Sequence, residues 1–186
     1  STGTKNHKFN SPGIKQQIET FIANNSEQSN PKDFSKTLFT IWDTGNDYYF
    51  SDMSISPLDS VKSLINALHL LVKSIPTVSS LLILNLPDIS CVPAFKTVNE
   101  TERKLISKMI GLHNKCLLEH LLKFSSKTKV NIMHIRCDRL FNILQTDFGI
   151  INCIDVVTNI YELDYNDDII NTSQTSCVKD SNSYFY

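Results

Sequence analysis

The chain has 186 residues, of which 41% are hydrophobic and 20% are charged. This is ordinary globular composition with enough length for one domain and a full core, and it excludes a disordered or fibrous chain. Eighteen Lys and Arg residues against nineteen Asp and Glu residues give a net charge of −1, which argues against nucleic-acid and anionic-lipid partners. Lys, His or Asn interrupts the longest apolar stretches, so we expect no membrane span.

The first half of the chain predicts a helix, a strand and a second helix. Apolar residues at helical spacing, with Pro12 in the first turn, predict a helix from about Ser11 to Ala23. After a polar loop, Leu38–Trp42 reads as a buried strand that runs into a turn over residues 43–47. Ser56 as N-cap and Pro57 in the first helical position predict the next helix. Its apolar stripe consists of Leu58, Val61, Ile65, Leu68, Val72 and Ile75.

The second half continues the alternation of strands and helices. Ser80–Leu86 is apolar on both faces, as in a parallel sheet with helices on both sides. A capping box at Thr97 to Glu100 predicts a long helix that ends near Phe124, and a third strand follows over Val130–Ile135. A short helix over Asp138–Leu144 precedes an irregular segment from residue 147 to residue 186. Helices that separate successive strands predict βαβ units, a parallel sheet and the α/β class, in one domain over residues 1–186.

Cysteines and glycosylation motifs bear on localisation. The five cysteines at 91, 116, 137, 153 and 177 are odd in number and form no C-x-x-C motif. Sequons at Asn24, Asn99 and Asn171 permit N-glycosylation and favour a secreted protein. Cys153 and Cys177 either pair as a disulfide, in a secreted parent, or are two free thiols. The chain begins with neither Met nor a signal peptide and ends on three aromatic residues, so we expect both ends to be cut inside a domain.

Two groups of residues are candidates for chemistry. His113, Cys116 and His120 share one helix face and are zinc-type ligands, but the same face is apolar, so buried structural histidines are preferred and no metal is predicted. No glycine-rich phosphate loop and no Gly-x-Ser-x-Gly elbow occurs, so nucleotide binding and an elbow-type hydrolase have no motif support. No cofactor is predicted. Asn46 and Asp47 follow a buried strand, where ligand groups gather in parallel α/β sheets. An amide there can stabilise an oxyanion, although an ordinary turn uses the same residues.

Five stretches of the chain resemble those of a known protein family, in the same order, and this resemblance favours the oxyanion role of Asn46 over an ordinary turn. They are Ile14–Ile18, Phe39–Tyr48, Leu84–Pro93, His113–Leu118, and Asp138–Phe141 with Asp147–Gly149. On these stretches the chain resembles the GDSL, or SGNH, ester hydrolases, and within them the fungal acetyl esterases and plant GDSL lipase-like proteins. The resemblance implies a three-layer αβα sheet in the flavodoxin-like order and Asn46 as an oxyanion-hole donor. A second, backbone donor corresponds to Gly3, or to Thr2 in an alignment fixed on Thr4 and Asn6.

The chain departs from the family at the residues that carry out catalysis. Thr44 stands where the family has a glycine two places before the asparagine, and neither the Gly-Asp-Ser nucleophile block nor the Asp-x-x-His block occurs. In the family the serine attacks the ester carbonyl, the histidine takes its proton and the aspartate orients the imidazole. We therefore expect an incomplete fold and a chain close to inactive. The Leu38 strand, without its central neighbour, is expected to be an exposed apolar edge that invites aggregation or pairing with another chain.

The leading prediction is thus a fragment of a secreted ester hydrolase that acts on acetyl or short acyl esters, including those on carbohydrates. One alternative is a non-catalytic SGNH-fold module that binds a glycan or acyl group without turnover. Another is a plain flavodoxin-like α/β domain. The sequence leaves the acyl group, the alcohol and the oligomeric state open.

Overall fold

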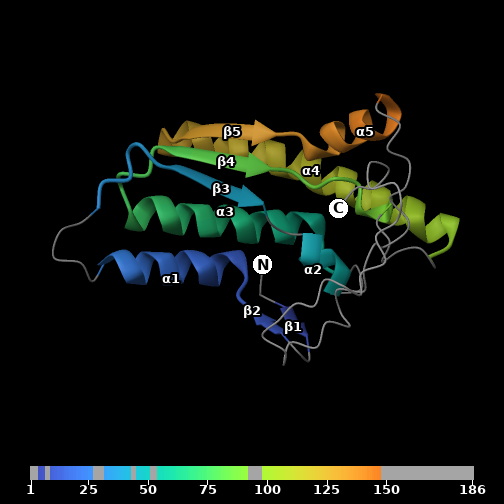
Figure 1. Ribbon diagram of the computed structural model, residues 1–186, viewed down its shortest axis with the longest axis horizontal. Helices are drawn as coiled ribbons and strands as arrows, with labels where there is room; N and C mark the ends of the chain where they lie inside the picture. Colours follow the sequence, from blue (N-terminus) through green and yellow to red (C-terminus); the bar gives the residue numbers. More distant parts are fainter. Residues whose placement is uncertain are drawn as a thin grey trace, which may run out of the picture.

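The computed structural model describes residues 4–6, 9–26, 32–42, 45–50, 54–91 and 98–147, which form alternating strands and helices (Figure 1). The strands are β1 (Thr4–Asn6), β2 (Phe9–Ser11), β3 (Leu38–Trp42), β4 (Ser80–Leu84) and β5 (Asn131–Ile135). The helices are α1 (Ile14–Ser26), α2 (Gly45–Phe50), α3 (Pro57–Ser74), α4 (Glu100–Thr128) and α5 (Cys137–Asp147), and residues Ile89–Cys91 form the 3-10 helix η1. None of the described helices is both long enough and apolar enough to cross a membrane.

The central sheet is parallel and confirms the α/β class. Its described strands lie in the order β3-β4-β5, with Leu38 beside Ser80 and Ser80 beside Asn131. Each step to the next strand passes through one helix, α3 and then α4. Both crossovers move in the same direction across the sheet, so the right-handed crossover rule places both helices on the same face.

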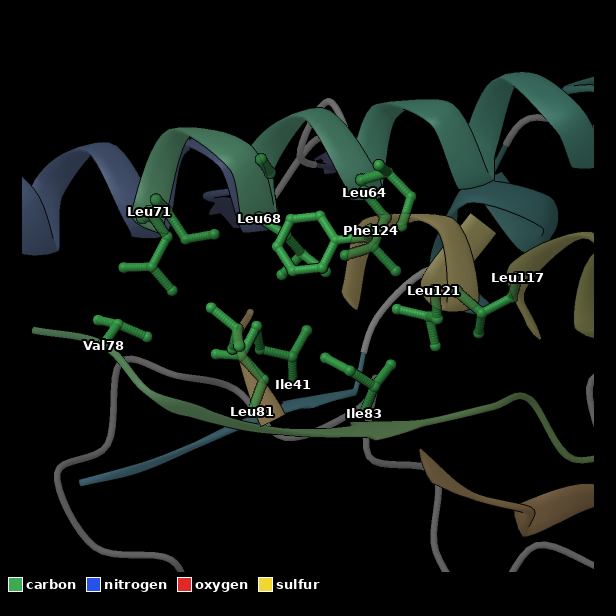
Figure 2. Packing of buried hydrophobic residues seen from close by; sticks show 14 of the residues in the cluster. Ile41, Leu64, Leu68, Leu71, Val78, Leu81, Ile83, Leu117, Leu121 and Phe124 are labelled. Atoms are coloured by element: carbon green, nitrogen blue, oxygen red, sulfur yellow. The ribbon is translucent and has the colours of Figure 1, made fainter. Parts of the chain in front are cut away.

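The main core lies between that face and the helices. Ile41, Leu81 and Ile83 point from the sheet toward Leu64, Leu68 and Leu71 of α3, and toward Leu117, Leu121 and Phe124 of α4 (Figure 2). Helix α1 extends this layer alongside α3 (Figure 1). Its Phe21 contacts Phe34 and Phe39, with ring centroids 5.5 Å and 5.4 Å apart, and this aromatic cluster attaches α1 to the start of β3.

The opposite face of the sheet carries no helix among the described residues, so a second helix layer is not seen there. Leu38, Trp42, Met133 and Ile135 point away from the core and are exposed, and no described helix covers them. The physical reason is the common direction of the two crossovers, because a helix reaches the second face only where the strand order reverses. Among the described strands, β3 lies at the edge of the sheet, and its apolar Leu38 and Trp42 side chains are exposed, in line with the predicted exposed apolar edge.

Local signals placed most helix and strand ends within a few residues. Ser56 caps α3 as predicted, its Oγ accepting a hydrogen bond from the backbone N–H of Asp59. The predicted cap of α4 was wrong: Asn99 caps that helix instead, its Oδ1 accepting from the N–H of Glu102 at 2.9 Å. Thr97 lies outside the described residues.

Two further differences concern short elements. Residues 45–47, predicted as part of a turn, instead begin helix α2, which starts three residues after β3 ends. The antiparallel pair of β1 and β2 was not predicted, because each strand has only three residues and carries no apolar alternation. Gly3, the segment 148–186 and the possible Cys153–Cys177 disulfide all lie outside the described residues.

Candidate functional site at the carboxyl end of the sheet

Polar side chains follow the carboxyl ends of all three strands of the central sheet. Asn46 and Asp47 follow β3, Asn85 follows β4, and Arg136 and Asp138 follow β5. The three arrows point the same way in Figure 1, so these residues share one edge of the sheet, with α2 and α5 beyond the arrowheads. This edge is where open parallel α/β sheets bind ligands.

Helix α2 is held in place by a buried polar pair. The Tyr48 hydroxyl lies 2.8 Å from Nδ1 of His113 on α4, and the two rings meet edge to face with centroids 5.6 Å apart. Both side chains are almost completely buried, beside Leu86, Ile106 and Ile110. Burial lowers the pKa of His113 to about 4 and raises the pKa of Tyr48 above its usual range, so both groups are neutral at pH 7.

Asn46 and Asp47 differ in their exposure although they are neighbours on α2. Asn46 is exposed, while Asp47 is half-buried and burial raises the pKa of its carboxyl. The start of α2 packs against the residues that follow β4: a Cβ atom added to Gly45 would lie 3.7 Å from Cδ2 of Leu86. Contacts of Tyr48 and Gly45 therefore hold α2 against the core, and the Asn46 side chain stays accessible beyond the end of β3.

The chain leaving β4 is fixed by a side chain from α4. Asn114 Oδ1 accepts a hydrogen bond from the backbone N–H of Leu86 at 3.0 Å, and its Nδ2 donates to the Leu86 carbonyl oxygen at 2.8 Å. The amide thus imitates a neighbouring strand for one residue. Asn114 lies in one of the stretches that carry the family resemblance, and its role here is structural.

A second clamp joins the ends of β4 and β5. Asn85 Nδ2 donates to Asp138 Oδ1 at 2.7 Å, and Asn85 Oδ1 accepts from the Asp138 backbone N–H at 3.1 Å. Arg136 Nη2 donates to Asp138 Oδ2 at 2.6 Å. Burial works to raise the pKa of Asp138, but the hydrogen bonds from Arg136, Asn85 and the Arg139 N–H outweigh it and lower that pKa.

The histidine and cysteine residues of α4 have structural contacts. His113 faces Tyr48, whereas His120 Nδ1 donates to the Cys116 carbonyl oxygen at 2.8 Å and lies 3.5 Å from Cys116 Sγ. Among the described residues, no three His, Cys, Asp or Glu side chains are grouped closely enough to hold a metal ion. The interpretation of His113 as a buried, hydrogen-bonded core histidine is confirmed.

The remaining described histidines also lie in structural positions. The His69 ring packs on Phe124 with centroids 4.7 Å apart. His134 lies on β5, on the same sheet face as Ile83, and burial lowers its pKa.

Sequence reasoning located Asn46 at a strand end but missed the two pairs that organise this edge, Tyr48–His113 and Asn85–Asp138. Their members are 65 and 53 residues apart, and no local pattern signals such a contact. No protein-family model matches the chain, and no curated protein sequence matches it either.

Proposed function

We propose that this chain carries the oxyanion-stabilising part of an SGNH-type ester hydrolase site, with Asn46 as the side-chain donor. The observation that carries the proposal is the position of Asn46: its side chain is exposed directly beyond the carboxyl end of β3, on a helix whose Tyr48 is anchored in the core. Such an anchor limits the movement of the amide, and a fixed donor stabilises developing charge better than a mobile one.

The proposed chemistry is the hydrolysis of acetyl or other short acyl esters, with carbohydrate esters among the substrates. The carbonyl oxygen becomes negatively charged when a nucleophile adds to the ester, and an amide N–H from Asn46 donates to it. Loss of one such donor costs about 3 kcal/mol of transition-state stabilisation in a complete site. Gly3 is the proposed second donor through its backbone N–H. The hydrolysis itself needs no metal and no cofactor.

The proposal includes catalytic incompleteness of these 186 residues. They contain neither Gly-Asp-Ser nor Asp-x-x-His, and His113, His120 and His69 contact Tyr48, Cys116 and Phe124 respectively. We expect no turnover from an oxyanion donor alone, because stabilising an intermediate does not create the nucleophile that forms it. The same observations support the alternative of a non-catalytic SGNH-fold module that binds a glycan or acyl group without hydrolysing it.

Secretion is part of the proposal. Asn24 and Asn99, the first residues of two sequons, are both exposed in the structure, so a glycan on either would extend into solvent. Protein secreted from a eukaryotic host and then treated with a glycosidase would show whether either site is occupied.

Two measurements on the wild type, Asn46→Ala and Asn131→Ala test the assignment. Asn131 is the matched control, since it is also an exposed asparagine but lies at the opposite end of the sheet. Methylphosphonate, a tetrahedral anion that imitates the intermediate, is expected to shift the Asn46 side-chain amide resonances in the wild type and in Asn131→Ala. If these resonances do not move at any concentration, Asn46 is not an oxyanion donor.

Hydrolysis of p-nitrophenyl acetate tests catalytic incompleteness separately. We expect all three proteins to leave the spontaneous rate unchanged. Turnover by the wild type that falls in Asn46→Ala would support Asn46 as an oxyanion donor. It would also contradict the proposed catalytic incompleteness, because a nucleophile would then be present. Binding of an acetylated oligosaccharide without acetate release would favour the binding module.

A further inference from the structure

The second face of the central sheet is an apolar surface with no charge. The strand register places nine side chains on it, three from each strand: Leu38, Thr40, Trp42, Ser80, Leu82, Leu84, Asn131, Met133 and Ile135. None of the nine is ionisable, although charged residues make up 20% of the chain. We call these nine residues the open face.

Exposure on the open face is large. Leu38 is 47% exposed, Trp42 55%, Met133 38% and Ile135 39%. The labelled helix residues in Figure 2 all approach the sheet from the other side, and their strand partners belong to the opposite set of alternating positions. An exposed parallel sheet face is unusual, because parallel sheets occur almost only with both faces covered.

The area of the open face is that of an interaction surface. With about 200 Å² for a large side chain, the four exposed fractions leave roughly 350 Å² open, and Thr40, Leu82 and Leu84 extend this to about 500 Å². Two such faces in contact would bury about 1,000 Å², which is the lower limit for a specific protein–protein interface.

We propose that the open face binds a second copy of this chain, sheet against sheet, in a two-fold symmetric dimer. A two-fold contact needs a surface that is complementary to itself, and an uncharged apolar face meets this condition, since no like charges oppose one another. The net charge of −1 adds almost no long-range repulsion between copies. Sheets that pack face to face lie about 10 Å apart and interdigitate their side chains, so Trp42 would become buried. This dimer is independent of the proposed function.

Trp42 is the only tryptophan in the chain, so its fluorescence reports on the open face alone. The test combines a dilution series followed by Trp42 emission with molar mass from sedimentation or light scattering. We expect a dimer at high concentration, a monomer at low concentration, and a red shift of the emission over the same range. Agreement between the two curves would establish that association and burial of the open face are the same event.

Leu38→Lys and Leu122→Lys form the matched pair of variants. Both change an exposed leucine, but Leu122 lies on α4 and is 64% exposed. We expect Leu38→Lys to weaken association at least tenfold, because it places an unpaired charge in each half of an apolar interface. Leu122→Lys is expected to change association less than twofold. Circular dichroism and a thermal melt of both variants show that each remains folded.

Three results would overturn the proposal. A monomer at every concentration would do so, with red-shifted emission if the face stays open and blue-shifted emission if the rest of the same chain covers it. An open-ended series of larger species would exclude a closed dimer and indicate pairing at the β3 edge. Equal weakening by Leu38→Lys and Leu122→Lys would place the contact elsewhere.

Discussion

The buried His113 makes a quantitative prediction about the pH dependence of folding. Its pKa is about 4 in the folded chain, compared with about 6.5 for an unperturbed histidine. At pH values between these two pKa values, His113 is protonated in the unfolded chain but not in the folded chain, so the free energy of unfolding decreases as the pH falls. A difference of about 2.5 pKa units corresponds to about 3 kcal/mol lost between pH 6.5 and pH 4, at most about 1.4 kcal/mol per pH unit.

His113→Asn removes this titration while keeping an acceptor near the Tyr48 hydroxyl. The substitution lowers stability at neutral pH, because it leaves a cavity, but it is expected to flatten the dependence on pH. Other groups titrate as well. As the pH falls, the raised pKa of Asp47 increases the stability of the fold and the lowered pKa of His134 decreases it. The lowered pKa of Asp138 decreases stability only when the pH falls through the pKa that this carboxyl has in the unfolded chain.

The assay is urea unfolding of the wild type and His113→Asn at several pH values from 7.5 to 4.5. Subtracting the two curves removes the groups that both proteins share. Tyr48→Phe is the control for cause: it is expected to lose about 1–3 kcal/mol at neutral pH but to keep the wild-type slope, because burial rather than the hydroxyl lowers the His113 pKa. Equal slopes in the wild type and His113→Asn would refute this reasoning.

Three further substitutions test the fold and are checked by denaturant unfolding. Asn114→Ala leaves a backbone N–H and a carbonyl unpaired beyond β4 and is expected to cost about 2–3 kcal/mol, whereas Asn131→Ala stays within about 0.5 kcal/mol; equal effects would reject the clamp. Leu68→Ala, in the centre of the core, is expected to cost about 3 kcal/mol, and a loss no larger than that of the exposed Leu122→Ala would contradict the assigned core. Lys129 ends α4 with φ of 60°, so Lys129→Gly is expected to raise stability by about 0.5–1 kcal/mol; a loss would argue against the left-handed cap.

The candidate site could be predicted from the sequence only in part. The position of Asn46 beyond a strand follows from the apolar run of Leu38–Trp42, because a strand and the residues directly after it are local features, although only Ile41 of this predicted buried strand is buried. The exposure of Asn46 could not be predicted, since it depends on the burial of Tyr48 against His113, 65 residues away. The role of Asn46 as a donor stays a prediction.

By itself the sequence determined the parallel α/β class and the main elements, because their signals are carried by residues close together in the chain. Helix α3 needed only Ser56, Pro57 and a stripe at steps of three and four, and β3 needed only five apolar or β-branched residues. Only the tertiary structure decided which sheet face is covered. β4 is apolar on both faces, and the direction in which each crossover passes over the sheet left Trp42 in solvent and Leu81 in the core.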